Sequence, residues 1–108
     1  MADYRMIVLT RPVEGREDEY NKWYSDIHLP EVLMTEGFVA AQRFKLVDGQ
    51  DGPAPYLAIY EVVSDDFPTS FAKLIKRVED GEVMMSSALD TSAASASGYE
   101  PITQRITG

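Results

Sequence analysis

The 108-residue sequence contains no cysteine. This absence excludes disulfide bonds, thiolate nucleophiles, iron–sulfur clusters and cysteine-ligated zinc. Long apolar runs are also missing, and a stretch such as Met6–Leu9 is far too short to cross a bilayer. The amino terminus lacks the basic and then apolar pattern of a secretory signal. From these absences we expect a cytoplasmic protein.

Positive charge is scarce. The chain has 10 lysine and arginine residues against 18 aspartate and glutamate residues, which gives a formal net charge of −8. Such a surface repels nucleic-acid phosphates and anionic lipids, so we expect neither a nucleic acid nor a membrane as a partner. A small molecule or another protein chain remains. The length and the 44% hydrophobic content predict a single domain over residues 1–108.

Changes in hydrophobic period along the chain predict six elements. Strand-forming residues predict strands over 4–10, 38–47, 56–63 and 99–106. Apolar spacings of three and four predict a helix over 16–27, a kink near 28–30 with a continuation to 35, and a second helix over 66–78. The small residues of 88–98 predict a loop or a loose helical turn. This order is typical of the α+β ferredoxin-like βαββαβ fold, a four-stranded antiparallel sheet with two helices on one face.

Both faces of the predicted sheet carry large apolar side chains. In the third strand Tyr60 and Val62 point one way, while Leu57 and Ile59 point the other. Two helices can cover one face only, and an exposed apolar sheet face usually marks an interface. We therefore expect a homodimer packed sheet against sheet, which closes into an α/β barrel.

The densest group of chemically useful side chains lies at residues 23–31. It contains Trp23, Tyr24 and His28, the only histidine of the chain. Tyr24 and His28 are four residues apart, so they lie on one side of a helix. Pro30 follows at once and breaks the helix, which lets a side chain turn into a pocket. Histidine titrates near neutral pH and is the commonest general acid or base.

The chain resembles the EthD-like group of dimeric α/β-barrel proteins over roughly residues 4–106. The motifs that carry the resemblance are Trp23-Tyr24, His28-Leu29-Pro30, Gly37-Phe38, Ala41-Gln42-Arg43-Phe44 and Tyr56-Leu57-Ala58-Ile59-Tyr60-Glu61. The resemblance implies a ferredoxin-like subunit, paired through its sheet, with a pocket between sheet and helices. Its histidine corresponds to His28 and its arginine to Arg43. The wider superfamily includes cofactor-free monooxygenases, polyketide cyclases, isomerases, lyases and haem-degrading enzymes.

Each of the other candidate residues has two interpretations. Arg43 lies mid-strand among apolar neighbours, so it pairs with an acid such as Glu61 or binds a substrate anion. Tyr56 and Tyr60 share one sheet face, where they bind substrate or pack across strands. Trp23 is a wall of the core or of the pocket. One histidine with neighbouring carboxylates matches a facial-triad inventory, but nothing fixes their directions, and we expect no metal.

The leading hypothesis is a cofactor-independent enzyme that acts on an apolar, aromatic or polyketide-like oxygenated small molecule. His28 moves a proton, and Tyr24 or Tyr60 polarises a carbonyl, as in a lyase, cyclase or isomerase. Cofactor-free monooxygenation is the nearest enzymatic alternative. A second class of hypothesis is a non-catalytic accessory protein that binds the same ligand. A third is haem binding with His28 as the axial ligand.

Overall fold

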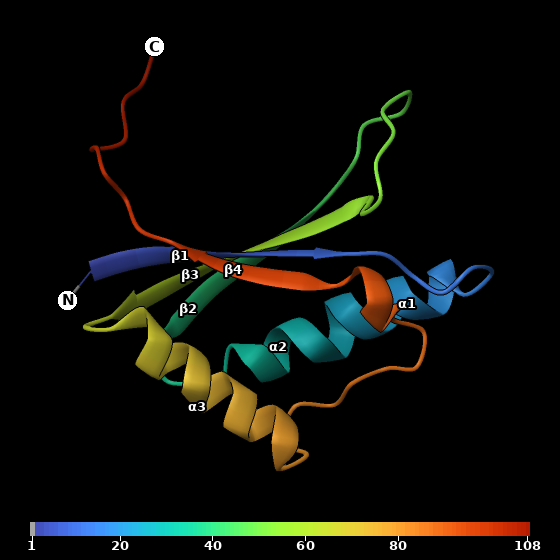
Figure 1. Cartoon of the computed structure of the whole chain (residues 1–108), viewed down its shortest axis with the longest axis horizontal. Helices are drawn as coiled ribbons and strands as arrows, with labels where there is room; N and C mark the ends of the chain where they lie inside the picture. Colours follow the sequence, from blue (N-terminus) through green and yellow to red (C-terminus); the bar gives the residue numbers. More distant parts are fainter. Residues whose placement is uncertain (1) are drawn as a thin grey trace.

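The computed structural model, which describes residues 2–108, has one layer of helices packed against one sheet (Figure 1). In chain order its elements are β1 (Ala2–Thr10), α1 (Glu17–Trp23), the π-helical turn η1 (Tyr24–His28), α2 (Leu29–Val32), β2 (Phe38–Lys45), β3 (Tyr56–Ser64), α3 (Phe67–Glu79), the 3₁₀ turn η2 (Thr91–Ala93) and β4 (Ser95–Tyr99). The strands pair in the order β2-β3-β1-β4, each antiparallel to its neighbours. The predicted ferredoxin-like fold is confirmed.

The predicted helices form where the sequence places them, with small shifts at their ends. The Asp66 carboxylate accepts a hydrogen bond from the Thr69 backbone N–H at 3.3 Å and caps α3. The predicted kink of the first helix takes the form of η1, with Pro30 in the first turn of α2. Gly37 then turns the chain into β2 with φ of +91°, and a Cβ there would come within 2.9 Å of the Val63 carbonyl oxygen.

The last strand was predicted wrongly. It is Ser95–Tyr99 rather than residues 99–106, so the small residues assigned to a loop form part of the sheet. The cause is packing, because a Cβ on Gly98 would lie 2.3 Å from the Phe67 ring at the start of α3. Position 98 therefore accommodates only glycine beside this helix, and glycine has a low intrinsic preference for strands. Pro101, which has no N–H to donate, follows the end of the ladder.

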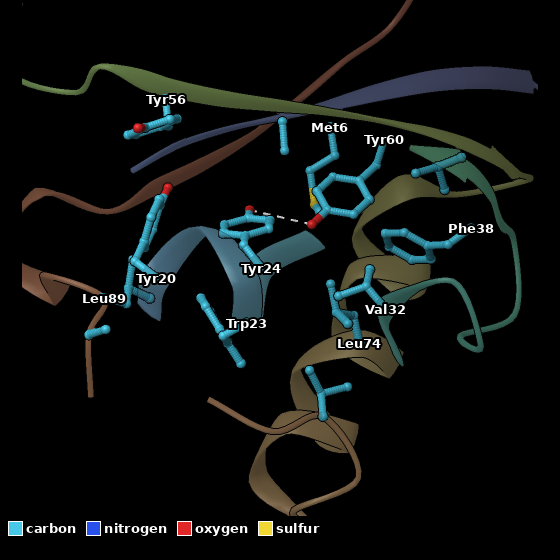
Figure 2. Packing of buried hydrophobic residues seen from close by; sticks show 14 residues of the cluster. Met6, Tyr20, Trp23, Tyr24, Val32, Phe38, Tyr56, Tyr60, Leu74 and Leu89 are labelled. Atoms are coloured by element: carbon cyan, nitrogen blue, oxygen red, sulfur yellow. Dashed lines mark hydrogen bonds between the residues drawn. The ribbon is translucent and has the colours of Figure 1, made fainter. Parts of the chain in front are cut away.

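The two faces of the sheet have different neighbours. Tyr60 and Val62 of β3 are buried under the helices, and the Tyr60 hydroxyl meets that of Tyr24 in η1 (Figure 2). On the opposite face Leu9 is 36% exposed and Phe44 is 43% exposed. The alternation predicted for β1 and β3 is therefore present, and nothing in residues 2–108 covers the second apolar face. Across residues 2–108, no helix combines the length and apolar composition needed to span a membrane.

Candidate functional site

The π-helical turn η1 shapes the site. Pro30 donates no N–H and its ring crowds the carbonyl four residues earlier, so a regular α-helix cannot continue through this point. The wider hydrogen-bonding pattern of a π-turn relieves this conflict. In an α-helix Trp23 and His28 would point about 140° apart. Here their ring centroids lie 4.6 Å apart, and the His28 ring lies 4.8 Å from that of Tyr24. The turn thus gathers the three rings.

A cavity opens beside these rings, between β1 and β4 on one side and the helices on the other. It consists of two adjoining lobes of about 240 and 160 Å³. Together they fall within the roughly 300–1,000 Å³ typical of small-molecule sites. The residues that line both lobes are Val8, Tyr24, His28, Met85 and Ala96.

The walls of the cavity are almost entirely apolar or aromatic. The larger lobe extends to Trp23 and Leu89, and the smaller lobe extends to Tyr60 and Phe71. Within the described chain no aspartate, glutamate, lysine or arginine lines either lobe. The lining therefore suits an uncharged molecule of low polarity, held in orientation by a few hydrogen-bonding groups.

His28 contributes the titratable nitrogen atoms of the cavity wall. Its Nδ1 atom is buried and has no hydrogen-bond partner among residues 2–108. Burial lowers the pKa of His28 to about 4, while the Met84 backbone and the Glu31 carboxylate act in the opposite direction. The imidazole is therefore neutral at pH 7, and a neutral imidazole accepts a proton or a hydrogen bond. An unpartnered polar atom in such a place is unusual in a folded protein and requires an explanation.

Tyr24 supplies a hydrogen-bond donor next to His28. The Tyr60 hydroxyl donates to the Tyr24 hydroxyl at 3.4 Å, as drawn in Figure 2, which leaves the Tyr24 O–H free to donate to another group. Burial raises the pKa of Tyr24 to about 12 and also raises the pKa of Tyr60. Both phenols thus stay protonated at neutral pH, and the ring that carries the Tyr24 O–H lies 4.8 Å from the neutral imidazole.

The segment that contains Met84 and Met85 closes one side of the cavity. The Trp23 indole N–H donates to the Met84 carbonyl oxygen at 3.1 Å, and the Met84 N–H donates to the Glu31 carboxylate at 2.7 Å. These bonds tie the segment to the interrupted helix on both sides of His28. Met85 then lines both lobes, as expected for a pocket methionine.

Arg43 and Tyr56 lie outside the cavity lining. The Arg43 guanidinium donates to the Asn21 side-chain oxygen and to the Ser25 hydroxyl, each at 2.8 Å, and to the Asn21 carbonyl oxygen at 3.4 Å. It also stacks 4.5 Å from the centre of the Tyr24 ring, on the helix side of the sheet. Tyr56 accepts from the Asn21 amide at 3.1 Å and donates to the Glu17 carboxylate. Through these contacts both residues help to hold α1 and η1, which carry the site, against the sheet.

The pairing of Arg43 with Glu61 was predicted wrongly. Glu61 approaches Arg5 instead, at 3.7 Å, on the open face of the sheet. The register shift between Phe38 and Ala40 places Arg43 opposite Ala58, on the helix-covered face. A bulge of this kind reverses which side chains face the core, and the residue types alone give no sign of it.

Two groups of lining residues were missed from the sequence. One is the start of β4, where Ser95 and Ala96 line the cavity, because residues 88–98 were assigned to a loop. The other is α3, where Phe71 and Ile75 face the smaller lobe and were assigned only to a helix stripe. The short side chains of β4 are themselves the missed signal, since they leave room for a cavity. No group of three or more potential metal ligands comes together anywhere in residues 2–108.

Comparisons with known proteins bear on the fold. No protein-family model matches the sequence, and no curated protein matches it. Among solved structures, an EthD-like protein from Ralstonia eutropha matches with a TM-score of 0.63 at 15% identity, covering 97% of this chain and 96% of the other. A Shewanella loihica protein provisionally named a monooxygenase matches with a TM-score of 0.64 at 14% identity over 95% and 97%. The haem degrader MhuD from Mycobacterium tuberculosis matches with a TM-score of 0.62 at 16% identity over 95% and 99%. The chain therefore has the fold of the EthD-like proteins, and the resemblance seen in its sequence is confirmed at that level.

Proposed function

We propose that the cavity binds an apolar oxygenated molecule, aromatic or polyketide-like, and that the protein is a lyase, cyclase or isomerase that works by proton transfer. One observation carries the proposal: a neutral, partly buried imidazole, His28, whose Nδ1 atom has no partner in residues 2–108, lies beside the ring of Tyr24, whose O–H is free to donate. A base and a hydrogen-bond donor side by side in an apolar cavity suit removal of a proton next to a carbonyl group.

In the proposed reaction the substrate carbonyl oxygen accepts a hydrogen bond from Tyr24. His28 takes a proton from the adjacent carbon, so the C–H bond breaks and its electron pair passes into an enolate. Tyr24 stabilises the enolate oxygen, and Tyr60 donates to Tyr24 from behind. The imidazolium then returns its proton to another atom of the substrate. Because burial disfavours the charged imidazole, His28 gives up the proton readily.

Two other interpretations use the same cavity. A non-catalytic binding protein would hold the ligand through the same hydrogen bonds, and its His28 would serve as an acceptor only. A cofactor-free monooxygenase would deprotonate the substrate in the same way and then add oxygen, an activity suggested by the name of the Shewanella loihica match. The three functions differ in one measurable property each: hydrogen exchange at carbon, binding alone, or oxygen consumption.

Haem does not fit the cavity. Its two carboxylates would need cationic partners, and no lysine or arginine lines either lobe within the described residues. We therefore assign no step to haem. Addition of haem to the protein should give no Soret shift that depends on His28.

We also propose that two copies pair through the open face of the sheet. Ile7, Leu9 and Ile59 lie on this face, opposite the helix layer, and Leu9 is 36% exposed. A flat apolar sheet surface packs well against a second one about 10 Å away. The cavity lies on the other side of the sheet, so pairing would leave it accessible.

The decisive experiment follows the single histidine by NMR while aromatic and polyketide-like carbonyl compounds are added. A ligand that shifts the His28 signals is then incubated with the protein in D₂O. We expect the protein to accelerate exchange of hydrogen at the carbon next to the carbonyl group. His28→Gln should bind the ligand within a few-fold of the parent affinity and lose the exchange.

Tyr24→Phe tests the donor, and Tyr4→Phe is its matched control because Tyr4 packs against Phe67 away from both lobes. We expect Tyr24→Phe to slow exchange about 100-fold, as is typical for one lost oxyanion donor, and Tyr4→Phe to leave it unchanged. Binding without exchange by the parent protein would contradict the enzymatic proposal and favour the accessory protein. Oxygen consumption with the ligand would favour the monooxygenase.

A further inference from the structure

The two lobes of the cavity have walls of different chemistry. The larger lobe, of about 240 Å³, extends to Trp23. The centre of the Trp23 ring system lies 4.6 Å from that of His28 and 5.2 Å from that of Tyr24. Flat side chains gathered in this way offer offset or edge-to-face contacts to another ring. The larger lobe therefore suits the planar, aromatic part of a ligand.

The smaller lobe is lined mostly by hydrocarbon side chains. Among the described residues that line this lobe alone, only Tyr60 has a side-chain oxygen or nitrogen atom, and its hydroxyl already donates to Tyr24. A polar group placed here would lose its hydration and gain little in return. An alkyl chain would gain contact with the other side chains of the lobe, which include Val32, Phe71, Leu74, Ile75 and Val78.

His28 and Tyr24 belong to the wall that both lobes share. A ligand group that reaches the Nδ1 atom of His28 and the Tyr24 hydroxyl therefore lies where the lobes meet, and not deep in either one. Ala96, which faces Val8 in the β1–β4 ladder, also lines both lobes. Its side chain is a single methyl group, so it leaves the two lobes connected. A ligand held at His28 and Tyr24 can extend in both directions.

The volume of the smaller lobe limits the length of the chain that it can hold. The lobe measures about 160 Å³. A group of the size of a water molecule takes up about 30 Å³ in a liquid, so a chain of about five carbon atoms fills the lobe. Ile75 lines the lobe and is 40% exposed, which opens the lobe to solvent beside α3. Carbon atoms beyond this length would emerge into water.

We propose that the ligand is an aryl alkyl ketone, or a molecule built in the same way, whose carbonyl group lies between two apolar arms. The ring lies in the larger lobe beside Trp23, the carbonyl group lies at Tyr24 and His28, and the alkyl chain lies in the smaller lobe against α3. An aryl group has no hydrogen on the carbon next to the carbonyl group, so the first methylene of the chain supplies the proton that His28 removes. This inference rests on the proposed function, to which it adds the class of substrate and its orientation.

A homologous series of phenyl ketones tests the alkyl arm. Acetophenone carries a methyl group, and propiophenone, butyrophenone and valerophenone add one, two and three methylene groups to it. We expect each methylene to tighten binding roughly fourfold, so that valerophenone binds about 60-fold more tightly than acetophenone. Quenching of the fluorescence of Trp23, the only tryptophan of the chain, gives the dissociation constants.

An isomer of valerophenone supplies the matched control. In para-propylacetophenone the additional carbon atoms lie on the ring, so they extend away from the smaller lobe when the carbonyl group is at His28. Its apolar area is close to that of valerophenone, but we expect it to bind no more tightly than acetophenone. Equal affinities for the two isomers would overturn the inference.

Nuclear Overhauser effects between the ligand and the protein test the orientation. In the complex with valerophenone we expect contacts from the terminal methyl of the chain to the methyl groups of Ile75 and Val78. The ring hydrogens should contact the indole of Trp23. The opposite pattern, with ring hydrogens next to Ile75 and Val78, would overturn the assignment of the two lobes.

Ile75→Phe and Val78→Phe add bulk to the smaller lobe from two positions of α3. We expect at least one of them to reduce the preference for valerophenone over acetophenone to that of a single methylene, roughly fourfold. Ala72→Phe adds a ring at an exposed position of the same helix outside both lobes and should leave the preference at about 60-fold. A full preference in both lobe variants would contradict the placement of the chain.

The inference and the proposed function fail in different ways. A preference for valerophenone over its isomer, without exchange of the hydrogen atoms next to its carbonyl group in D₂O, would support the two-armed ligand and overturn only the proposed catalysis. Exchange in both isomers at equal affinity would overturn the two-armed ligand and leave the proposed reaction in place.

Discussion

Two partly buried polar groups that pack against the same helix meet opposite conditions. Arg43 comes from β2, and its guanidinium has hydrogen-bond acceptors on Asn21 and Ser25 as well as the face of the Tyr24 ring. His28 has a buried Nδ1 atom with no partner in the described chain and a cavity beside it. The Arg43 guanidinium finds its hydrogen-bond partners within the fold, whereas the Nδ1 atom of His28 does not find one in residues 2–108. The contrast separates a polar group that supports the structure from one that is available for a ligand.

The largest expected effect on stability comes from removing the Arg43 guanidinium and its hydrogen bonds. Arg43→Met leaves the Asn21 and Ser25 acceptors without their donor and removes the cation from the Tyr24 ring. We expect the free energy of unfolding to fall by about 3 kcal/mol, measured by urea denaturation. Arg5→Met is the control, because its 3.7 Å ion pair with Glu61 is half exposed and should contribute less than about 0.5 kcal/mol. Equal losses of unfolding free energy in both variants would show that Arg43 supports the structure no more than an exposed surface arginine does.

A second effect on stability comes from protonating His28, whose Nδ1 atom has no hydrogen-bond partner in the described residues. The unfolded chain binds a proton at His28 below about pH 6.5, and the folded chain binds it only below about pH 4. Stability should therefore fall as the pH drops from 6.5 to 4, by about 3 kcal/mol at most from this group, with no further loss below pH 4. The difference between the parent and His28→Gln isolates this part from the carboxylates. Parallel stability curves over that range would show that His28 is solvated.

The smallest expected effect concerns the phenol pair. Tyr60→Phe removes the hydrogen bond to Tyr24 while keeping the packing of the ring. The free energy of unfolding should fall by about 1 kcal/mol, and the pKa of Tyr24 should rise because the Tyr60 hydroxyl holds it down. Ultraviolet titration of the phenols would follow that change. A stability equal to that of Tyr4→Phe, together with an unchanged Tyr24 titration, would show that the 3.4 Å contact has no energetic weight.

Most of the fold was predictable because its signals are periodic. The alternation of Tyr56, Ala58, Tyr60 and Val62 identifies the buried face of β3, and all four are buried. The acidic cap at Asp66 identifies the start of α3. β4 was not predictable in this way, since its five residues Ser95–Tyr99 carry mostly small side chains whose purpose is to pass Phe67 and line a cavity. The strand preference of a residue type reflects how its side chain packs. In β4 the packing requires mostly small side chains, so the usual strand-forming residues are missing.

The site was predictable in part. Trp23, Tyr24 and His28 lie close together in the sequence, and Tyr60 shares their face by strand period, so these residues were found and do line the cavity. The partners of Arg43 were not predictable, because a bulge between Phe38 and Ala40 decides which face Arg43 occupies. Such a bulge depends on backbone pairing across the sheet and not on local composition.

The π-helical turn at Tyr24–His28 makes the site sensitive to chain length as well as to residue identity. A π-turn contains one residue more than the α-helical turn it replaces. Deletion of a single residue, such as Asp26, would let the helix close in the α-helical pattern and would rotate every later position by about 100°. The pairing of the strands would stay the same, but His28 would no longer lie beside Trp23. Insertions and deletions of one codon at this point are therefore a route by which proteins of this fold can acquire or abandon a site in a single genetic step.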